Sequence, residues 1–381
     1  MRKKVLFLIE SLAGGGAENV LSTIVKYLDK AKFDITLCCV SNVGPFLRHL
    51  PSSVNYHYIL PDPSELTGIK LLLYRVKYKL VHSWLPTKWV YRFFVPKGND
   101  IEVAFVEGFA TKLVAASPFK RTKKIAWVHI DLAQLSWTQD CGVFRGLEDE
   151  IANYSRFDRI VCVSKAVSDA FKKVYKPRPN VSVVYNPIDS DNILSRSKED
   201  CRIPDKSKLR LVSMGRLVPQ KAFDRLLRVA SRLMNDGFDF DLWIMGDGIC
   251  RNALNNLVEK EGLSDRVVLW GFKPNPYPYL ASADLFVCSS LAEGYSTAAT
   301  EAIVLGIPVV TTDCAGMREM LVDSGCGLIT SNDEMSLYQG LKTVLESPST
   351  LMTLKKAALE KRYTFSINGL MAPIEALLEE C

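Results

Sequence analysis

Short apolar runs alternate with amphipathic segments along almost the whole chain, and this alternation limits the possible folds more than any other feature. In the first half the apolar runs predict strands at Val5–Ile9, Ile35–Val40, Leu80–Ser83, Val103–Val106, Ile125–Ile130, Ile160–Val163 and Val181–Val184. In the second half they predict strands at Leu211–Met214, Leu242–Met245, Val267–Leu269, Leu285–Val287, Val309–Thr311 and Leu328–Ile329. Strands that alternate with helices favour an α/β fold with parallel sheets covered on both faces.

The length and one polar segment predict two domains. A chain of 381 residues is long enough for two domains. Ser190–Lys208 is polar and lacks a hydrophobic period, so we interpret it as a linker. We therefore expect one domain at 1–189, a second at 190–365 and a terminal helix within 366–381.

Composition favours a cytoplasmic globular protein. Hydrophobic residues make up 48% of the chain and charged residues 24%. The first apolar run stops at Glu10, which is too short for a signal peptide, and no run approaches the length of a transmembrane helix. Ten cysteines include no C-x-x-C pair, and Cys38, Cys39, Cys162 and Cys288 lie in apolar runs. This pattern is typical of reduced core thiols.

Basic residues are concentrated in the first half. Residues 1–189 hold 27 Lys and Arg against 17 Asp and Glu, a balance of +10, whereas residues 190–381 hold 21 against 25, a balance of −4. The first half is therefore expected to meet an anionic partner. Within it, segment 70–97 mixes seven Lys and Arg with many aromatic residues, which suits the headgroup zone of a membrane. The alternative is that these are ordinary amphipathic helices of the domain; nucleic acid is not expected, because no recognition motif accompanies the charge.

The segment Cys288–Pro308 is the strongest candidate for a binding site. It predicts the end of a strand, a turn, and a helix that Ser296 or Thr297 caps. The amino end of a helix attracts anions, and the carboxylates of Glu293 and Glu301 are suited to accept hydrogen bonds from sugar hydroxyls beside such an anion. An ordinary strand–turn–helix with two solvated glutamates remains the alternative.

Other candidates follow predicted strands, at the sheet edge where α/β proteins bind ligands. Arg216 and Lys221 could hold a diphosphate and stabilise it as a leaving group, or could be surface cations. Gly246 marks a further turn at such an edge. Gly14–Gly16 follow the first strand, where they allow close approach of a ligand or simply form a tight turn.

Histidines are few, and two of the four follow predicted strands. His129 ends the strand at 125–130, and its position facing the other domain favours a catalytic role over a structural one; His82 is the next candidate. No set of residues has the spacing of a metal site, so no metal is assigned.

Taken together, these motifs resemble the retaining glycosyltransferases of family 4, which share the GT-B fold. The most specific element is the E-x7-E pattern from Glu293 to Glu301, followed by Gly306-Ile-Pro308. It is supported in order along the chain by Gly14–Glu18, His129, Val163-Ser164, Asn186-Pro187, Gly215-Arg216 with Lys221, Gly246–Gly248 and Gly271-Phe272. Asn275–Tyr279 is similar to members that build bacterial surface polysaccharides or lipopolysaccharide. Ala222 departs mildly from the family, in which glycine is frequent.

The resemblance implies a role for each residue. Arg216 and Lys221 would bind the donor's diphosphate, with backbone N–H groups near Tyr295, Ser296 and Thr297 and the loop at Gly15 and Gly16. Glu293 would hold the donor sugar, Glu301 the ribose, and Phe272 with its neighbours the base. His129 would contact the sugar near the reacting carbon, and Gly246 would lie at the ligand edge.

The resemblance also implies two Rossmann-like domains with a cleft between them and a last helix that crosses back to the first domain. The expected enzyme is a retaining, metal-independent hexosyltransferase without a cofactor. It would move a sugar from a nucleotide-diphosphate donor, with a UDP-sugar favoured, to a glycan or lipid-linked acceptor on the inner face of the plasma membrane. The alternatives are a nucleotide-sugar epimerase and a non-catalytic nucleotide-sugar-binding subunit.

Overall fold

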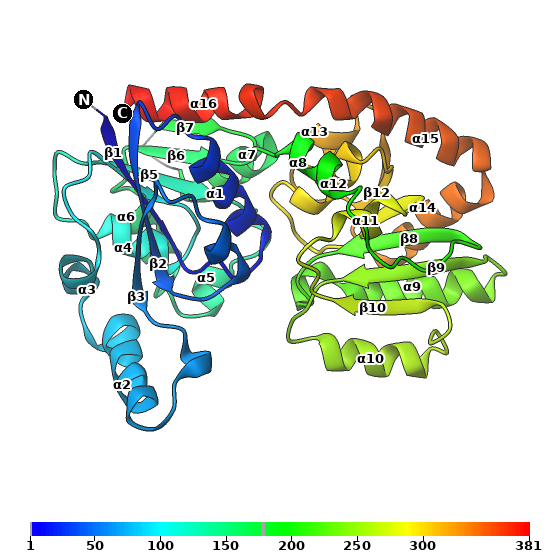
Figure 1. Cartoon of the computed structure of the whole chain (residues 1–381), viewed down its shortest axis with the longest axis horizontal. Helices are drawn as coiled ribbons and strands as arrows, with labels where there is room; N and C mark the ends of the chain where they lie inside the picture. The colour runs from blue at the N-terminus through cyan, green and yellow to red at the C-terminus, as the bar shows by residue number, and fades with distance from the viewer. Residues whose placement is uncertain (1, 177–179) are drawn as a thin grey trace. The chain divides into compact units, whose positions relative to one another are not determined.

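The chain forms two compact units. The computed structural model describes residues 2–176 and 180–381. One unit runs to Pro187 and also contains Leu370–Cys381, and the other comprises Ile188–Gly369 (Figure 1). The expected boundaries at 189 and 365 therefore differ from these by two and four residues. The hydroxyl of Ser190 donates to the carbonyl of Phe365 at 2.8 Å, which ties both ends of the second unit together.

The first unit is built on a seven-stranded parallel sheet in the order β3-β2-β1-β4-β5-β6-β7. Its strands are β1 (Lys3–Ile9), β2 (Phe33–Ser41), β3 (Asn55–Leu60), β4 (Ile101–Ala104), β5 (Lys123–Val128), β6 (Arg159–Cys162) and β7 (Asn180–Val183). Its helices are α1 (Gly16–Tyr27), α2 (Gly68–Lys79), α3 (Thr87–Phe94), α4 (Phe109–Ala115), α5 (Trp137–Asp140), α6 (Leu147–Tyr154) and α7 (Lys165–Tyr175).

Two predictions for this unit were wrong. The run Leu80–Ser83 is not a strand but lies in a π-helix, Leu80–Trp84, which continues α2 and buries only Val81. The edge strand β3 was missed because four of its six residues are at least partly exposed and only Ile59 and Leu60 are buried. An edge strand of this kind carries no continuous apolar run, so its sequence does not stand out.

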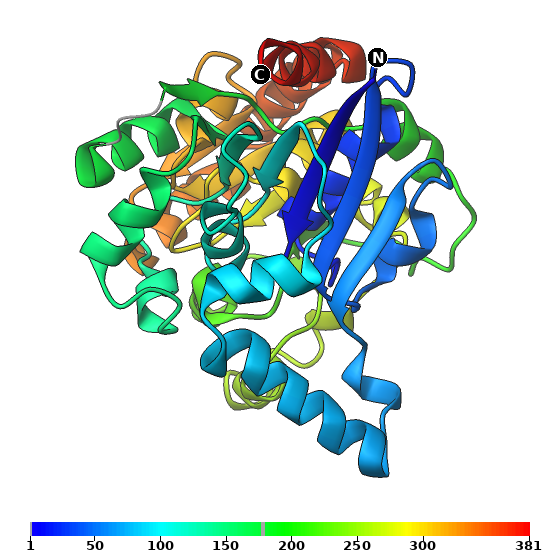
Figure 2. The same cartoon turned by 90° about the vertical axis from the view of Figure 1, so that its left-hand side faces the viewer.

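The helix α2 stands apart from the rest of its unit. It projects beyond the sheet, as both views of the ribbon show (Figure 2), and none of its residues is buried. The neighbouring helix α3 buries only Val90 and Tyr91. This part of the chain therefore presents most of its side chains to its surroundings.

The second unit contains a six-stranded parallel sheet in the order β10-β9-β8-β11-β12-β13. Its strands are β8 (Leu209–Met214), β9 (Phe240–Met245), β10 (Val267–Gly271), β11 (Leu285–Cys288), β12 (Val309–Thr312) and β13 (Gly327–Thr330). Its helices are α8 (Ser190–Arg196), α9 (Phe223–Asn235), α10 (Arg251–Lys260), α11 (Tyr277–Ala281), α12 (Thr297–Val304), α13 (Met317–Leu321), α14 (Glu334–Glu346) and α15 (Pro348–Lys361). Leucines of α9, α10 and α14 share one buried core with the sheet.

The segment predicted as a linker begins with a helix. Asp189 caps α8 by accepting a hydrogen bond from the backbone N–H of Asn192 at 3.1 Å, and Ile193 is buried. Arg196 donates to the carbonyl of Pro274 at 2.9 Å, so α8 is fixed to the loop before α11. The linker interpretation was wrong for residues 190–196 because one capped turn with a single buried contact gives no hydrophobic period.

The last helix, α16 (Ile367–Glu380), is bound to the first unit from Leu370 onward. It buries Met371, Ile374, Leu377 and Leu378. The ammonium of Lys3 donates to the carbonyls of Leu378 and Glu379, where it also complements the negative end of the helix dipole.

Candidate active site

The candidate residues of the second unit converge at the point where the strand order reverses. β8 and β11 are neighbours in the sheet, although one is followed by α9 and the other by α12. The loops after such a pair of strands diverge and leave room for a ligand at the carboxyl edge of the sheet. Arg216 and Lys221 lie in the loop after β8, and Glu293 lies in the loop after β11.

An ion pair joins these two loops. The Lys221 Nζ atom lies 2.6 Å from Glu293 Oε1, and the two side chains are only 20% and 9% exposed. The hydroxyl of Ser290 donates to the same carboxylate oxygen at 2.6 Å. Burial is the largest single influence on the pKa of Lys221 and lowers it, but the charge and hydrogen bond of Glu293 and the neighbouring Cys288 together raise that pKa above its ordinary value. Lys221 is therefore a charged, positioned ammonium at physiological pH.

Backbone hydrogen bonds hold the same two loops together. The backbone N–H of Leu291 donates to the carbonyl of Gln220 at 2.8 Å. The side-chain amide of Gln220 donates to the carbonyl of Ala292, also at 2.8 Å, and the hydroxyl of Ser289 donates to the carbonyl of Lys221 at 2.9 Å. The geometry of the ion pair is thus set by the backbone on both sides.

Gly246 is required by close packing of the turns. It has a φ of +134°, and a Cβ atom there would lie 1.9 Å from the carbonyl oxygen of Gly215. A contact of that length with backbone cannot be relieved by a side-chain rotation. Gly246 therefore allows the turn after β9 to pack against the loop that carries Arg216. This packing explains the glycine without a ligand contact.

The amino end of α12 is capped as predicted from its sequence. Ser296 is the capping residue: its hydroxyl accepts a hydrogen bond from the backbone N–H of Ala299 at 3.3 Å. Tyr295 and Thr297 flank the cap and are partly exposed. The end of the helix therefore lies beside the Lys221–Glu293 pair, in the same turn of chain as Glu293.

Glu301 lies one turn further along α12 and is buried. Tyr277 of α11 donates its hydroxyl to Glu301 Oε1 at 3.4 Å. Burial raises the pKa of Glu301 to about 7, even though the Tyr277 hydroxyl and the Arg196 guanidinium favour the carboxylate. Sequence reasoning missed Tyr277, which is 24 residues from Glu301 in the chain.

Among the candidate site residues of the second unit, Arg216 and Phe272 have exposed side chains. The Arg216 side chain is exposed just after β8, and Phe272 is 47% exposed just after β10. β10 is two strands away from β8 in the sheet. Both side chains are at the carboxyl edge but are not buried in the ion-paired cluster.

In the first unit, Gly15, Gly16 and His129 lie at the corresponding edge of the other sheet. Gly15 precedes the first residue of α1, Gly16. A Cβ atom on Gly15 would lie 2.3 Å from Glu18 Oε2, the movable end of a side chain. His129 follows β5, two strands away from β1.

His129 is held as a neutral ring. Burial lowers the pKa of His129 to about 3, although a hydrogen bond with the backbone of Phe105 raises it. The Phe105 ring lies 4.8 Å from the imidazole, centroid to centroid. Nε2 is buried and has no hydrogen-bond partner among the described residues. The hydrogen bond to the Phe105 backbone raises this pKa, so the ring donates it, through Nδ1. Nε2 of the neutral ring can therefore accept one hydrogen bond from a ligand, and the ring carries no second proton to act as an acid.

A buried carboxylate that the sequence did not reveal positions His129. Glu107 accepts hydrogen bonds from the backbone N–H groups of His129 and Ile130, the second at 3.0 Å. Burial raises the pKa of Glu107 to about 7 despite these bonds. Glu10 plays a similar part after β1, where it accepts from the backbone N–H of Ala110 at 3.1 Å. Glu107 sits two residues before the start of α4, and nothing in its local sequence marks it as a loop anchor.

His82 is placed differently from His129. Its ring packs against the rings of Tyr78 and Phe109, each tilted by 39°, with centroid distances of 4.3 Å and 4.6 Å. Burial lowers its pKa. Packing between aromatic rings of α2 and α4 favours a structural role. Among residues 2–176 and 180–381, His, Cys, Asp and Glu side chains do not gather in a group of three or more that could hold a metal ion.

Comparison with known proteins assigns both halves of the chain. Residues 14–192 match the family described as Glycosyltransferase Family 4, and residues 196–361 match Glycosyl transferases group 1. The chain is 30% identical over 374 residues to an N-acetylgalactosaminyltransferase of Campylobacter jejuni that acts on N-acetylgalactosamine-N,N'-diacetylbacillosaminyl-diphospho-undecaprenol, with 96% of each chain covered. The chain belongs to family 4 of the glycosyltransferases.

Solved structures agree with the fold. The Anabaena protein HepE in complex with UDP-glucose has a TM-score of 0.74, with 20% identity and coverage of 99% of this chain and 100% of that one. WaaG, a glycosyltransferase of lipopolysaccharide biosynthesis, has a TM-score of 0.66 with 17% identity, and covers 98% and 99%. The predicted GT-B class is confirmed, and the activity is glycosyl transfer in polysaccharide synthesis. No helix within the described residues is long and apolar enough to span a membrane.

The ion pair generates a prediction about stability. Replacing Lys221 by Met leaves the Glu293 carboxylate in a buried position without its counter-ion. We expect the free energy of unfolding to fall by roughly 2–4 kcal/mol at pH 7.5, below the full value for a buried pair because Lys221 is partly exposed. Urea denaturation at pH 7.5 measures the loss.

The matched control for this experiment is the double variant Lys221→Met/Glu293→Gln. It removes both charges and should recover most of the lost stability. If the double variant were no more stable than the single variant, the stranded carboxylate would not be the source of the loss.

Proposed function

We propose that the chain is a retaining, metal-independent glycosyltransferase that uses a nucleotide-diphosphate sugar. The observation that supports this most directly is the Lys221–Glu293 pair, which holds one cation and one carboxylate side by side at the carboxyl edge of β8 and β11. A sugar diphosphate requires both: a positive group for the phosphates and a hydrogen-bond acceptor for the sugar hydroxyls.

The leaving group is stabilised by fixed charge in this proposal. Lys221 has one N–H directed at Glu293 and further protons that can reach a diphosphate oxygen. Arg216, on the same loop, adds a guanidinium that can bind phosphate in a bidentate manner. The free N–H groups at the amino end of α12 add a partial positive charge. These groups carry the negative charge that develops on the departing nucleoside diphosphate, and so no metal ion is required.

The carboxylates hold the donor's hydroxyl groups. We assign Glu293 to the sugar. Lys221 and Ser290 both donate to Oε1 and so position the carboxylate, which allows Oε2 to accept hydrogen bonds from the sugar hydroxyls. We assign Glu301 to the ribose and the exposed Phe272 ring to the base. His129 is assigned to the sugar near the reacting carbon, with Nε2 as its contact.

The transfer step needs no carboxylate base. The bond between the anomeric carbon and the phosphate oxygen breaks, and the acceptor oxygen bonds to that carbon from the face that the leaving group vacates. The acceptor proton passes to a phosphate oxygen of the departing diphosphate. Because departure and attack share a face, the configuration of the anomeric carbon is retained. The neutral state of His129 fits this scheme, since the ring contributes a hydrogen bond and not a proton.

The relatives indicate the substrate classes. The Campylobacter enzyme acts on a sugar linked through a diphosphate to undecaprenol, and HepE has been solved with UDP and with UDP-glucose. We therefore propose a UDP-sugar donor and a lipid-linked or glycan acceptor of bacterial surface polysaccharide synthesis. The enzyme would act in the cytoplasm on the inner face of the plasma membrane.

Donor turnover tests this function. Purified protein is incubated with a panel of UDP-, GDP- and ADP-sugars, with and without EDTA, and nucleotide release is measured. We expect one donor to be turned over despite EDTA. Lys221→Ala should lower kcat/KM at least about a hundredfold, as loss of a group that stabilises developing charge does, whereas Lys356→Ala on the exposed face of α15 should have no effect.

The products separate the alternatives. Transfer to an acceptor with the donor's anomeric configuration, seen by NMR, supports the retaining mechanism, and inversion contradicts it. Isomerisation of the nucleotide sugar without transfer would show an epimerase. A folded protein that binds no donor would overturn the whole proposal in favour of a partner subunit.

The raised pKa of Glu301 predicts a pH dependence. A carboxylate can accept hydrogen bonds from both ribose hydroxyls, whereas the protonated carboxyl accepts less well. Donor kcat/KM should therefore fall as pH decreases through about 7, where Glu301 protonates in the free enzyme. Tyr277→Phe should shift this limb to higher pH, because it removes a hydroxyl that favours the carboxylate. Glu301→Gln should lower kcat/KM and abolish the limb; a limb unchanged in Glu301→Gln would assign it to another group.

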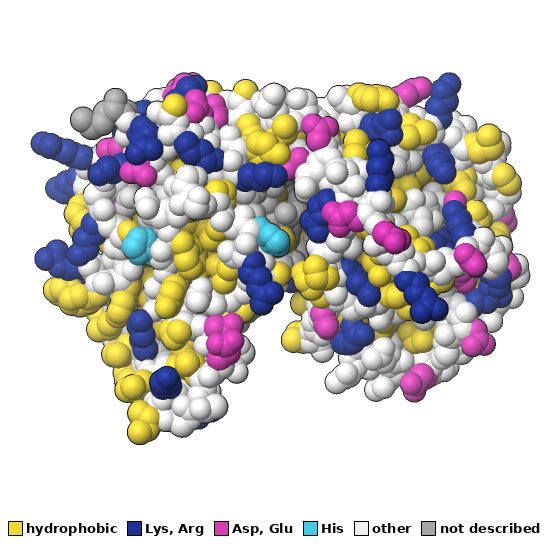
Figure 3. Space-filling view, viewed as in Figure 1, with side chains coloured by type: hydrophobic (Ala, Val, Ile, Leu, Met, Phe, Trp, Pro, Cys, Tyr) yellow, Lys and Arg dark blue, Asp and Glu magenta, His cyan; other side chains and the backbone are white. Residues whose placement is uncertain are grey.

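We also propose that α2 and α3 contact an anionic membrane. Hydrophobic side chains gather over this part of the first unit with Lys and Arg among them (Figure 3), and Ile69, Leu72, Leu73, Trp84 and Phe93 are all more than half exposed. Three lysine ammonium groups lie over exposed or half-exposed rings: Lys77 over Phe94, Lys79 over Trp84 and Lys88 over Trp89. Apolar side chains beside cations are what the headgroup zone of a membrane accommodates.

Vesicle sedimentation tests the membrane contact. The protein should pellet with phosphatidylglycerol-containing vesicles at low salt and much less with pure phosphatidylcholine. Leu72→Gln/Leu73→Gln should reduce pelleting severalfold, because it removes apolar area without changing charge. Met352→Gln, an equally exposed position on α15 of the second unit, serves as the control. Equal pelleting of all three proteins would contradict the assignment of the contact to α2.

A further inference from the structure

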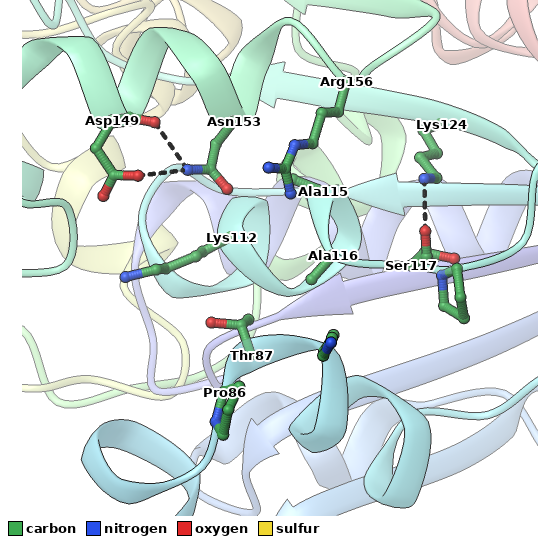
Figure 4. A pocket seen from close by; sticks show the side chains of 12 residues that line it. Pro86, Thr87, Lys112, Ala115, Ala116, Ser117, Lys124, Asp149, Asn153 and Arg156 are labelled. Carbon is green, nitrogen blue, oxygen red and sulfur yellow. Dashed lines mark hydrogen bonds between the residues drawn. The ribbon is translucent and has the colours of Figure 1, made fainter.

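A pocket lies on the first unit at the edge of its sheet where β5 begins. It has a volume of about 620 Å³ and is lined by α3, α4, the start of β5 and α6 (Figure 4). Lys124 lies at the start of β5 and His129 just past its end. Five residues of extended chain at about 3.3 Å each place them about 16 Å apart. The pocket therefore does not belong to the carboxyl edge where His129 and the Gly15–Gly16 loop lie.

The lining of this pocket is strongly basic. It contains Lys88, Lys112, Lys124 and Arg156, and the single acidic residue among the described lining residues is Asp149. Asp149 is already engaged: it accepts from the side-chain amide of Asn153 at 3.2 Å and from the backbone N–H of Arg145 at 3.1 Å. Lys112 is held by the carbonyl of Val143 and by the Phe144 ring, not by a carboxylate. Asp149 is thus the one carboxylate among the described lining residues that can offset the four cations.

The lack of ion pairs is particular to the cations of this pocket, because basic residues next to them in the sequence are paired. Lys123 pairs with Asp158 at 3.1 Å, and Arg159 pairs with Glu380 at 2.9 Å. Lys124 and Arg156, close to these residues in sequence, form no ion pair with a described carboxylate within 4.0 Å. The ammonium of Lys124 instead donates to the carbonyl of Ser117 at 2.8 Å, as Figure 4 shows.

The cations also repel one another. Burial lowers the pKa of Lys124. The carboxylates of Glu102 and Asp158 act against burial, and the Arg156 guanidinium adds a smaller lowering effect. Figure 4 shows Arg156 descending from the end of α6, Lys112 extending from α4 and the hydroxyl of Thr87 below them on α3. An anion placed among these groups would relieve their repulsion and accept several charge-assisted hydrogen bonds.

We propose that this pocket binds a phosphate ester. A pocket of this volume is within the range of about 300–1,000 Å³ that small-molecule sites occupy, so it has room for the organic part of the ester as well as the phosphate. Its rim includes Pro86, Thr87 and Lys88, which begin α3, and the next residue is the half-exposed Trp89. The phosphate ester is either the headgroup of a membrane lipid or a soluble phosphate monoester.

The experiment uses the full chain and two probes. Glycerol 1-phosphate binding is measured by calorimetry, and vesicle binding is measured by sedimentation with 30% phosphatidylglycerol in phosphatidylcholine. The pocket variant is Lys124→Gln/Arg156→Gln. The control is Lys120→Gln/Arg121→Gln, which removes the same charge from exposed positions on the loop before β5. Thermal melting of both variants checks that they are folded.

The expected result is at least tenfold weaker binding of one or both probes by the pocket variant and unchanged binding by the control. Loss of vesicle binding alone assigns the pocket to a lipid headgroup, and loss of glycerol 1-phosphate binding alone assigns it to a soluble ester. If the pocket variant is unstable, Arg156→Gln alone, which changes one exposed side chain, must still weaken binding. The proposal is overturned if the wild type binds neither probe, or if pocket and control variants bind equally. Donor turnover by the wild type is a separate measurement, so failure here leaves the transferase proposal intact.

Discussion

The second unit is organised around one buried ion pair. Lys221 and Glu293 are 72 residues apart in the chain but meet at 2.6 Å where β8 and β11 diverge. A lone charge in either position would be costly, so each residue fixes the loop that carries the other. The turns behind them are packed so closely that Gly246 has no room for a Cβ atom. The ammonium of Lys221 and the carboxylate of Glu293 are therefore fixed side by side at the carboxyl edge of the sheet.

At the corresponding edge of its sheet, the first unit is held by buried carboxyl groups that accept hydrogen bonds from the backbone. Glu10 and Glu107 follow β1 and β4, the two strands between which the strand order of this sheet reverses. Glu10 accepts from a backbone N–H in the first turn of α4, and Glu107 accepts from backbone N–H groups of the loop after β5. Burial raises the pKa of both carboxyl groups to about 7. Their folded pKa lies above the ordinary value of 4.5, so the stability that these two groups contribute is fully present below about 4.5 and is lost as pH rises from there through about 7. The loop that carries His129 is thus held by hydrogen bonds rather than by an ion pair.

Local chemistry determined which parts could be predicted from the sequence. The turn and helix of Glu293–Val304 were predictable because a strand, a capping serine and a glycine stop lie within one short segment. Three contacts could not be predicted, because each depends on strands that become neighbours only in the sheet. They are the pairing of Lys221 with Glu293, the hydrogen bond from Tyr277 to Glu301 and the hydrogen bonds from the backbone at His129 to Glu107. β3 and α8 were missed for a related reason: β3 lies at an exposed edge and α8 buries one side chain, so neither has a clear hydrophobic period. The strand predicted at Leu80–Ser83 failed because a short apolar run fits a helix equally well.

The Lys and Arg residues of the first half fall into three groups that differ in their surroundings. Lys32, Lys123 and Arg159 are paired with carboxylates of their own unit. The lysines of α2 and α3 lie over aromatic rings on an exposed surface, whereas Lys124 and Arg156 face a pocket and lack such partners. A net charge counted from the sequence adds these groups together, although only unpaired cations can gain from an external anion. The sign of the net charge therefore favours an anionic partner, and the pattern of pairing identifies the surfaces for which we propose one.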